Sequence, residues 1–232
     1  MNKQLKRQQR EKNIILGTIE LLSEHGFLDL KMADIAKVSE CSMGVVYSHF
    51  ASKEDLLVGC AVEVIKKHQR WINELSHTTL DNREKLLVMP FLGWESSAIN
   101  PSESEVIQMA CLPSIWKRAS NNRVLELTRV GAETERSAVP IFTSALNVDA
   151  EKGKHFLCGI MGLTFGLREI DNSGFGMIEA NSAQLSSSHP FIDALRRYCA
   201  GWGFDFPNDE SEWRSAQETA RQIIHAVHKG RE

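Results

Sequence analysis

Apolar residues recur at helical spacing over the first 75 residues and divide this region into four runs. The first run stops at Gly26, a residue type favoured directly after a helix end. The second begins at Met32 and is short, and the third is also short and begins behind Ser42, a favoured helix N-cap. The fourth is long and begins behind Ser52, with Asp55 three positions later as a capping signature. The pattern predicts two long helices flanking two short ones that are joined by a tight break.

Helical spacing also dominates the rest of the chain, because the alternation that indicates strands is sparse there. The expected helices begin near Asn82, Asn100, Asn122, Asp149, Pro190 and Asp209. Pro90, Pro113 and Pro140 lie inside this pattern and should kink or bend the helices that contain them. Residues 171–189 combine several turn-prone clusters, which predicts a loop. The expected fold class is therefore all-α.

The 232 residues are 42% hydrophobic and 25% charged, which is the balance of a globular protein that buries a core. The longest apolar stretch, 156–167, is shorter than the ~20 residues needed to cross a bilayer, and no apolar signal-peptide core follows the basic start. These features predict a cytoplasmic protein without a membrane span. The five cysteines are odd in number and widely separated, which argues against a disulfide framework and against a cysteine metal site.

Residues 3–12 carry five basic side chains against one acidic side chain, in a chain whose formal net charge is -3. The basic residues are Lys3, Lys6, Arg7, Arg10 and Lys12. A basic tail of this kind is typical of segments that meet a polyanion. Two interpretations stay open: the tail reaches a DNA groove, or it is a solvated start of the chain.

Residues 31–57 show the layout of a helix-turn-helix, in which one short helix braces a second helix that enters the major groove. In the second helix Val46 and Phe50 are four positions apart and should face the core. The outward or lateral positions then fall to Met43, Gly44, Val45, Tyr47, Ser48 and His49. Exposed apolar side chains beside a glycine suit contact with base edges and thymine methyl groups.

These residues resemble the TetR family of transcriptional regulators. The matching marks are Ile15-Leu16 and Leu21-Leu22 with Gly26-Phe27, then Met32-Ala33-Asp34-Ile35-Ala36, then Ser42-x-Gly44-Val45-Val46-Tyr47-Ser48-His49-Phe50, and then Ser52-Lys53-Glu54-Asp55-Leu56-Leu57. The resemblance implies an all-α fold with a three-helix helix-turn-helix DNA-binding domain at 1–55. It also implies a larger helical bundle at 56–232 that binds an effector and dimerises.

The chain departs from the family pattern at one residue and in one three-residue turn. Lys31 stands where a Thr or Ser usually caps the second helix, and Ser39-Glu40-Cys41 stands where Ala-Gly-Val usually makes the turn. A non-glycine residue in the left-handed conformation costs roughly 1 kcal/mol. Either Glu40 accepts that conformation, or the break between the two helices is built differently.

By resemblance and by chemistry, one set of side chains is expected to contact DNA. The set is Lys31, Met32, Ser42, Met43, Gly44, Val45, Tyr47, Ser48, His49 and Lys53. The two lysines would face phosphates, the hydroxyl and imidazole groups would hydrogen-bond phosphates, and Met43 and Val45 would make apolar contacts with bases. The alternative for Tyr47 is a partly buried core aromatic, and the alternative for His49 is an ordinary surface histidine.

One recognition helix alone gives modest affinity, so a homodimer that binds a palindromic double-stranded operator is expected. The family resemblance implies that two long helices late in the chain form the dimer interface. The candidates are Cys158, Gly159, Gly162, Gly166, Trp213, Ala216, Ala220, Ile223, Ile224 and Val227. The alternative for the glycines is close helix packing within one subunit.

An unidentified small-molecule effector is the second expected partner. Its candidate contacts are aromatic and sulfur-containing side chains, for which ordinary core packing is the alternative. They are Phe91, Trp94, Met109, Trp116, Phe142, Met161 and Phe165.

A helical enzyme or metal protein is the leading alternative from another class. A di-iron bundle needs two Glu-x-x-His pairs, whereas this chain has one such pair, Glu74 and His77. No phosphate-binding or nucleophile motif occurs, so no catalytic residue, metal ligand or cofactor is assigned. A third interpretation is a helical dimeric protein-binding module without DNA binding. The preferred function is a homodimeric transcriptional repressor that a small-molecule ligand releases from its operator.

Overall fold

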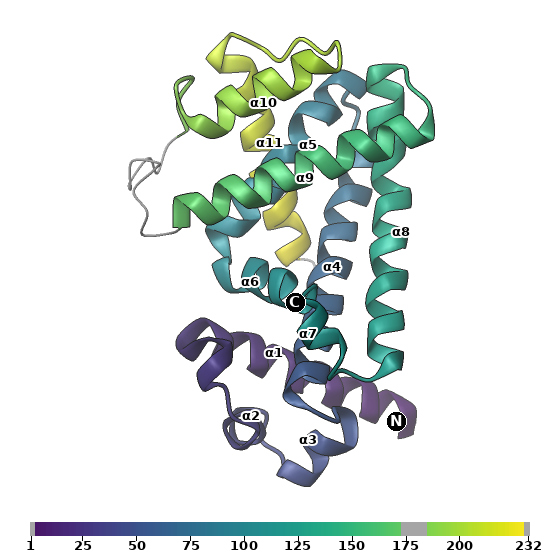
Figure 1. The fold of residues 1–232 in the computed structure, drawn as a ribbon, viewed down its shortest axis with the longest axis vertical. Helices are drawn as coiled ribbons and strands as arrows, with labels where there is room; N and C mark the ends of the chain where they lie inside the picture. The colour runs from purple at the N-terminus through teal and green to yellow at the C-terminus, as the bar shows by residue number, and fades with distance from the viewer. Residues whose placement is uncertain (1–2, 173–184, 230–232) are drawn as a thin grey trace. The chain divides into compact units, whose positions relative to one another are not determined.

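The computed structural model describes residues 3–172 and 185–229 (Figure 1). The helices of the first part are α1 (Lys3–Asp29), α2 (Met32–Val38), α3 (Met43–His49), α4 (Lys53–His77), α5 (Asn82–Ile99), α6 (Pro101–Ala110) and α7 (Pro113–Trp116). Those of the second part are α8 (Asn121–Leu146), α9 (Ala150–Asn172), α10 (Pro190–Gly201) and α11 (Glu210–Lys229). The described ranges contain no strand, and none of their helices is both long and apolar enough to cross a membrane. The predicted all-α class is confirmed.

The chain divides into two compact units. The first unit comprises Met1–Lys67 and Asn100–Ala132, and the second comprises His68–Ile99 and Glu133–Glu232. Helices α4 and α8 therefore each contribute residues to both units. All the residues expected to contact DNA belong to the first unit.

The hydrophobic core of the first unit joins α1–α4 to helices that come much later in the chain. Ile14 of α1, Val106 of α6 and Leu127 of α8 belong to the same buried cluster. Gly59 allows the ring of Phe50 to approach α4, because a Cβ at this position would lie 2.8 Å from Phe50 Cε1. The core beneath the helix-turn-helix is thus completed by α6 and α8.

The core of the second unit is built around aromatic side chains of α5. The rings of Phe91 of α5 and Trp213 of α11 stack with their centroids 6.2 Å apart. Trp94, also of α5, stacks on Phe191 of α10 at 4.0 Å. These ring contacts bury large apolar surfaces and pack α10 and α11 against α5.

Side-chain caps explain several of the helix starts. Asp149 Oδ1 accepts a hydrogen bond from the backbone N–H of Lys152 at 2.9 Å, as the sequence predicts for the start of α9. At the start of α5 the cap is Asp81 and not Asn82, because Asp81 Oδ1 accepts from the N–H of Glu84 at 2.8 Å. Glu84 returns a hydrogen bond to the N–H of Asp81, which completes a capping box.

The structure confirms one predicted helix end and corrects another prediction. The first helical segment ends at Gly26 as predicted, because Gly26 adopts the non-helical φ 69° and ψ 173°, and a second short helical segment within α1 continues beyond this kink to Asp29. Pro113 separates α6 from α7 and so ends one helix and starts another, because proline favours the first turn of a helix. Pro90 and Pro140 lie inside α5 and α8.

The loop predicted at 171–189 is described only in part. Its first two residues belong to α9, and α10 begins directly after its last residue. Residues 173–184 lie outside the described residues.

Candidate nucleic-acid interface

A tight turn joins α2 to α3. It closes where the N–H of Cys41 donates to Ala36 O at 2.9 Å. Glu40 adopts the left-handed conformation with φ 49°, so the first of the two sequence alternatives is confirmed, at a cost of roughly 1 kcal/mol. Ser42 then caps α3, because its Oγ accepts a hydrogen bond from the N–H of Val45 at 3.3 Å.

Helix α3 has a buried inner face and an exposed outer face. Val46 and Phe50 are both 0% exposed, which confirms their predicted placement. Met43 and Tyr47 are four positions apart on the outer face and are 45% and 49% exposed. Tyr47 is therefore a surface side chain and not a core aromatic. The other exposed residues of this segment are Ser42, Gly44 and Ser48, with Val45 half-buried.

His49 does not lie on the outer face, which corrects its predicted placement. Its side chain is 6% exposed, and its Nδ1 lies 3.3 Å from Oε2 of Glu11. The reason is helical geometry, because positions 46, 49 and 50 share one face at spacings of three and four residues. The imidazole therefore contacts α1.

The two lysines expected at phosphates differ in their surroundings. Lys31 precedes α2, is exposed and makes no side-chain cap. The ammonium of Lys53 donates to Leu28 O at 3.1 Å and lies 4.4 Å from the ring centroid of Phe27. Lys53 thereby ties the start of α4 to the end of α1, so part of its hydrogen-bonding capacity is used within the first unit. Met32 is half-buried and packs against the core.

The basic residues near the amino terminus belong to α1, so the predicted tail is wrong from Lys3 onward. Arg7 donates to Ser48 O at 3.4 Å, and Arg10 donates to Ser39 O at 3.2 Å. The two arginines thus contact carbonyl groups at the ends of α3 and α2. The exposed lysines of this segment are Lys3, Lys6 and Lys12.

Residues 14–60 match the model of a known family, described as bacterial regulatory proteins of the tetR family. The matched segment contains α2, α3 and the turn between them, together with most of α1 and the start of α4. The helix-turn-helix of this chain is therefore similar to the DNA-binding segment of that family of transcriptional regulators.

Solved structures of other regulators share the fold of this chain. FadR from Bacillus subtilis, solved in complex with stearoyl-CoA, is 15% identical, with a TM-score of 0.56 over 82% of this chain and 96% of that one. AmtR from Mycobacterium smegmatis is 15% identical, with a TM-score of 0.56 over 89% and 91% of the two chains. A tetR-family regulatory protein from Rhodococcus RHA1 is 18% identical, with a TM-score of 0.55 over 86% and 98%. No curated protein sequence gives a match.

The seven side chains expected to bind an effector occupy different environments in this protein. Met109 and Trp116 belong to the first unit, and the other five belong to the second. Phe91, Trp94 and Phe142 are at most 4% exposed and pack in the hydrophobic core, as in the alternative of ordinary packing. Met161 is 46% exposed, Trp116 is 37% exposed, and Phe165 is half-buried.

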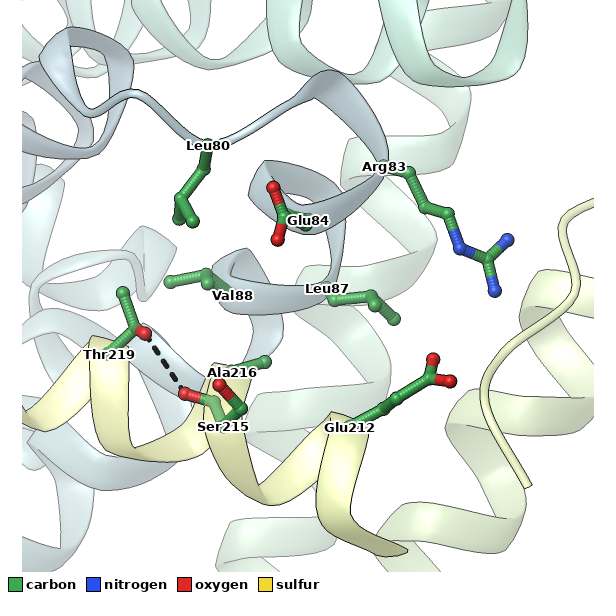
Figure 2. Close-up of a pocket in the computed structure, with 9 residues that line it drawn as sticks. All are labelled: Leu80, Arg83, Glu84, Leu87, Val88, Glu212, Ser215, Ala216 and Thr219. Atoms are coloured by element: carbon green, nitrogen blue, oxygen red, sulfur yellow. Dashed lines mark hydrogen bonds between the residues drawn. The ribbon is translucent and has the colours of Figure 1, made fainter. Parts of the chain in front are cut away.

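A pocket of about 220 Å³ lies in the second unit between the first turns of α5 and α11 (Figure 2). None of the seven predicted effector residues lines it. Its lining residues are Leu80, Arg83, Glu84, Leu87, Val88, Glu212, Ser215, Ala216 and Thr219. The pocket thus combines apolar walls with charged groups of both signs, a feature that helical periodicity does not reveal.

Among the described residues of the second unit, several buried polar atoms make no hydrogen bond, and sequence patterns gave no sign of them. They include Thr164 Oγ1, Arg168 Nε and His189 Nε2. The guanidinium carbon of Arg168 lies 4.5 Å from the ring centroid of Trp94, and the His189 ring meets Trp94 edge-on at 5.5 Å. Burial lowers the pKa of His189, Arg168 lowers it further, and Asp171 opposes them. Unpaired buried donors are costly, so this cluster marks a place where a hydrogen-bond acceptor would bind favourably.

Several of the predicted dimer contacts are wrong because their side chains are buried within the subunit. Trp213, Ala216, Ala220, Ile223 and Ile224 are at most 7% exposed and belong to the core of the second unit. The apolar face of α11 packs within its own subunit, and the partly buried Val227 packs against the same core.

For the glycines of α9 the sequence allowed either a dimer contact or close packing within one subunit, and the structure differs from one glycine to the next. Gly159 packs against Tyr198 of α10, which leaves no room for a Cβ, so the intrasubunit alternative is confirmed there. Gly162 and Gly166 have no heavy atom within 4 Å of an added Cβ, and Cys158 is exposed. These three positions form an open strip along α9 that remains available to a partner.

Proposed function

We propose that this protein is a TetR-family regulator, a homodimeric repressor that binds a palindromic operator and leaves it when a small molecule binds. The observation that carries the proposal is the outer face of α3, where Met43 and Tyr47 are about half exposed on a capped helix of a helix-turn-helix. The two side chains lie together on the outer face of this helix, where their apolar surfaces suit contact with base edges and thymine methyl groups. The proposed DNA-binding region is 1–55, with residues 56–232 serving effector binding and dimerisation in a cytoplasmic protein.

The chemistry of the outer face suits recognition of thymine-containing steps. Met43 and Val45 offer apolar contacts to thymine methyl groups, while Tyr47 can hydrogen-bond a phosphate or a base edge. Lys31 stands exposed at the start of α2 and supplies a positive charge for the DNA backbone. Sequence discrimination would therefore be largely apolar, with phosphate contacts fixing the register.

The open strip on α9 supports the dimer. Cys158, Gly162 and Gly166 lie at spacings of four residues, so they share one helix face. Small residues allow two helices to approach closely, which suits a symmetric contact between two copies of α9. Pairing two recognition helices would double the number of base contacts and match the two halves of a palindrome.

Ligand release is supported by two features of the second unit. The pocket between α5 and α11 and the unpaired donors of Arg168 and His189 each offer chemistry for a small molecule. A structural neighbour, FadR of Bacillus subtilis, was solved with stearoyl-CoA, so this fold accommodates a ligand in that protein. Release requires that the effector bind the DNA-free form more tightly than the DNA-bound form.

The proposal is tested by selecting duplexes from a random-sequence library with the purified protein. A palindromic consensus is expected, and a duplex that carries it is called the selected duplex below. Fluorescence anisotropy should show that its affinity falls steeply with salt, because phosphate contacts release counterions. If the selection enriched no sequence and the affinity for duplex DNA did not depend on salt, the result would favour the alternative function, a protein-binding module without DNA binding.

A further inference from the structure

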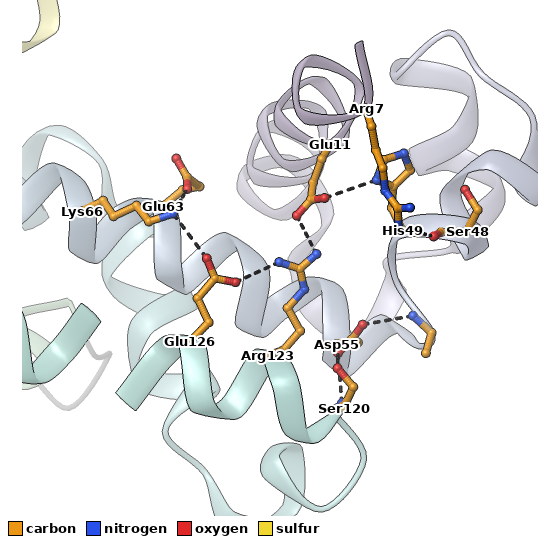
Figure 3. Close-up of polar contacts among 11 residues, drawn as sticks. Arg7, Glu11, Ser48, His49, Asp55, Glu63, Lys66, Ser120, Arg123 and Glu126 are labelled. Carbon is orange, nitrogen blue, oxygen red and sulfur yellow. Dashed lines mark hydrogen bonds and ion pairs between the residues drawn. The ribbon is translucent and has the colours of Figure 1, made fainter. Parts of the chain in front are cut away.

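The carboxyl-terminal end of α3 is held by the start of α8, which lies far downstream in the chain (Figure 3). The guanidinium carbon of Arg123, in α8, lies 4.8 Å from the ring centroid of Phe50. Arg123 Nη2 donates to Glu11 Oε1 at 2.5 Å, and the other carboxylate oxygen of Glu11 lies 3.3 Å from His49 Nδ1. Arg123, Glu11 and His49 thus form a polar chain, here called the α8–α3 chain, that runs from α8 through α1 to α3.

The α8–α3 chain is shielded from solvent. The side chains of Arg123, Glu11 and His49 are 16%, 26% and 6% exposed. Burial raises the pKa of Glu11, but the hydrogen bond and charge of Arg123, with a smaller contribution from His49, outweigh it and leave the pKa below its ordinary value. Shielded, charge-assisted hydrogen bonds are shorter and stronger than contacts on an open surface. Glu126 also accepts from Arg123, at 3.1 Å, which fixes the guanidinium from its own helix.

A second link joins the same two regions. Asp55, at the start of α4, accepts from the N–H of Ala51 at 3.0 Å. The same carboxylate accepts from the N–H and the hydroxyl of Ser120 at 2.9 and 2.7 Å. Ala51 follows the C-cap of α3 and Ser120 precedes α8, so Asp55 connects the two helix ends.

Helix α3 depends on such contacts for its orientation. It has seven residues, and helices of that length are not stable by themselves in water. The cap by Ser42 fixes only its first turn. The inner side chains Val46 and Phe50 are fully buried and anchor α3 on the core, which leaves the contacts at its last turn to fix its rotation on that core.

We propose that Arg123 is a positioning residue for DNA recognition, which sets the orientation of α3 through Glu11 and His49 without itself contacting DNA. The proposal rests on the function proposed above and adds how the recognition helix is controlled. Helix α8 continues to Leu146, and its residues from Glu133 onward belong to the second unit. A displacement of the start of α8 would therefore change the orientation of α3, and with it operator affinity, without a change in any DNA-contacting residue.

The test compares Arg123→Met with Arg129→Met in the full chain. Both changes remove one positive charge from α8, and Arg129 is exposed on that helix. Anisotropy is measured with the selected duplex and with a scrambled duplex of equal length, at several salt concentrations. Circular dichroism at the assay temperature gives the folded fraction of each variant.

The expected result is that Arg123→Met binds the selected duplex on the order of tenfold more weakly, whereas its affinity for the scrambled duplex stays within about twofold of wild type, since phosphate contacts supply non-specific binding. Arg129→Met should lower both affinities by less than about twofold. Because Arg123 makes no phosphate contact, the slope of log affinity against log salt should match that of wild type. Arg123→Lys should recover part of the loss, since lysine can still donate to Glu11.

A double-variant cycle keeps the proposal testable if Arg123→Met is poorly folded. Glu11→Gln combined with Arg123→Met leaves no unpaired charge, and its loss of affinity should equal that of either single change because both act in one chain. Equal weakening of both duplexes, wild-type affinity for the selected duplex, or a salt slope lower by about one would each overturn the proposal. Failure of the wild-type protein to select any duplex would instead overturn the proposed function, and this proposal with it.

Discussion

Asp55 offers a direct test of how the first unit is held together. Its side chain is 3% exposed, and its carboxylate accepts hydrogen bonds from the N–H groups of Ala51 and Ser120 and from the hydroxyl of Ser120. In Asp55→Ala both N–H groups lose their partner at a site that excludes most water. The hydroxyl of Ser120 can rotate to another acceptor, so the two backbone groups dominate the expected cost.

The magnitude follows from those two groups. A buried donor left without a partner costs about 1–3 kcal/mol, so Asp55→Ala should lower the free energy of unfolding by about 4 kcal/mol. A chain of this size loses about 2–4 °C of melting temperature per kcal/mol, which gives a decrease of about 12 °C. Ser120→Ala removes one hydrogen bond and leaves both N–H groups paired, so it should cost about 1 kcal/mol, or roughly 3 °C.

Thermal unfolding followed by circular dichroism measures these differences, and urea unfolding gives the free energies independently. Glu24→Ala is the control, because it removes an acidic side chain that is 58% exposed and should change the melting temperature by no more than about 2 °C. The reasoning would be refuted if Asp55→Ala melted within about 3 °C of wild type. It would also be refuted if Ser120→Ala cost as much as Asp55→Ala, since the backbone donors would then not decide the effect.

Three further predictions follow from the exposed and shielded groups. Tyr47→Ala should weaken binding to the selected duplex about tenfold by anisotropy without lowering the melting temperature, whereas the similarly exposed Leu125→Ala should leave affinity unchanged. The pKa of Glu11 is lowered in the folded state, so its carboxylate contributes fully to the free energy of unfolding above the ordinary pKa of 4.5 and loses that contribution as pH falls below it. Urea unfolding should therefore show that the difference in stability between wild type and Glu11→Gln narrows below about pH 4.5. A difference that stays constant with pH would contradict the ion pair. Gly162→Arg should give a monomer by sedimentation, whereas Gly131→Arg, at a second glycine with open space around it, should leave the dimer intact.

Local signals in the sequence were sufficient for the helix-turn-helix. The N-cap at Ser42 and the four-residue spacing of Val46 and Phe50 depend only on neighbouring positions, so the pattern located the recognition helix and its buried face. The left-handed conformation of Glu40 could also be predicted from the sequence, since a tight turn that lacks glycine must place another residue in that conformation or be built differently. His49 was predicted on the wrong side of the helix. The same spacing rule, applied three positions on from Val46, would have assigned it to the inner side.

Periodicity alone could not tell which surface an apolar helix face covers. The pattern of α11 marks a strongly amphipathic helix, but it contains no information on whether that face packs on its own subunit or on a partner. The structure shows that Trp213 and Ile224 are both fully buried within the subunit. Long-range polar contacts were equally hidden, because Arg123 and Glu11 are separated by 112 positions and neither lies in a recognisable motif.

The matched segment 14–60 therefore contains the proposed DNA-contacting face of α3 but not all of the hydrophobic core beneath it. Val106 and Ile115 of α6 and α7, with Leu127 and Val130 of α8, are at most 8% exposed and belong to the core that lies beneath α3. Burying four such side chains contributes about 1.5–3 kcal/mol each, or roughly 6–12 kcal/mol in total, which is comparable to the whole stability of a typical domain. The same helices that supply this burial also supply Arg123, so they stabilise the DNA-binding fold and orient its recognition helix at once. A regulator built in this way can change the orientation of α3 only by disturbing contacts that also stabilise the unit, which limits the change to shifts that preserve the core.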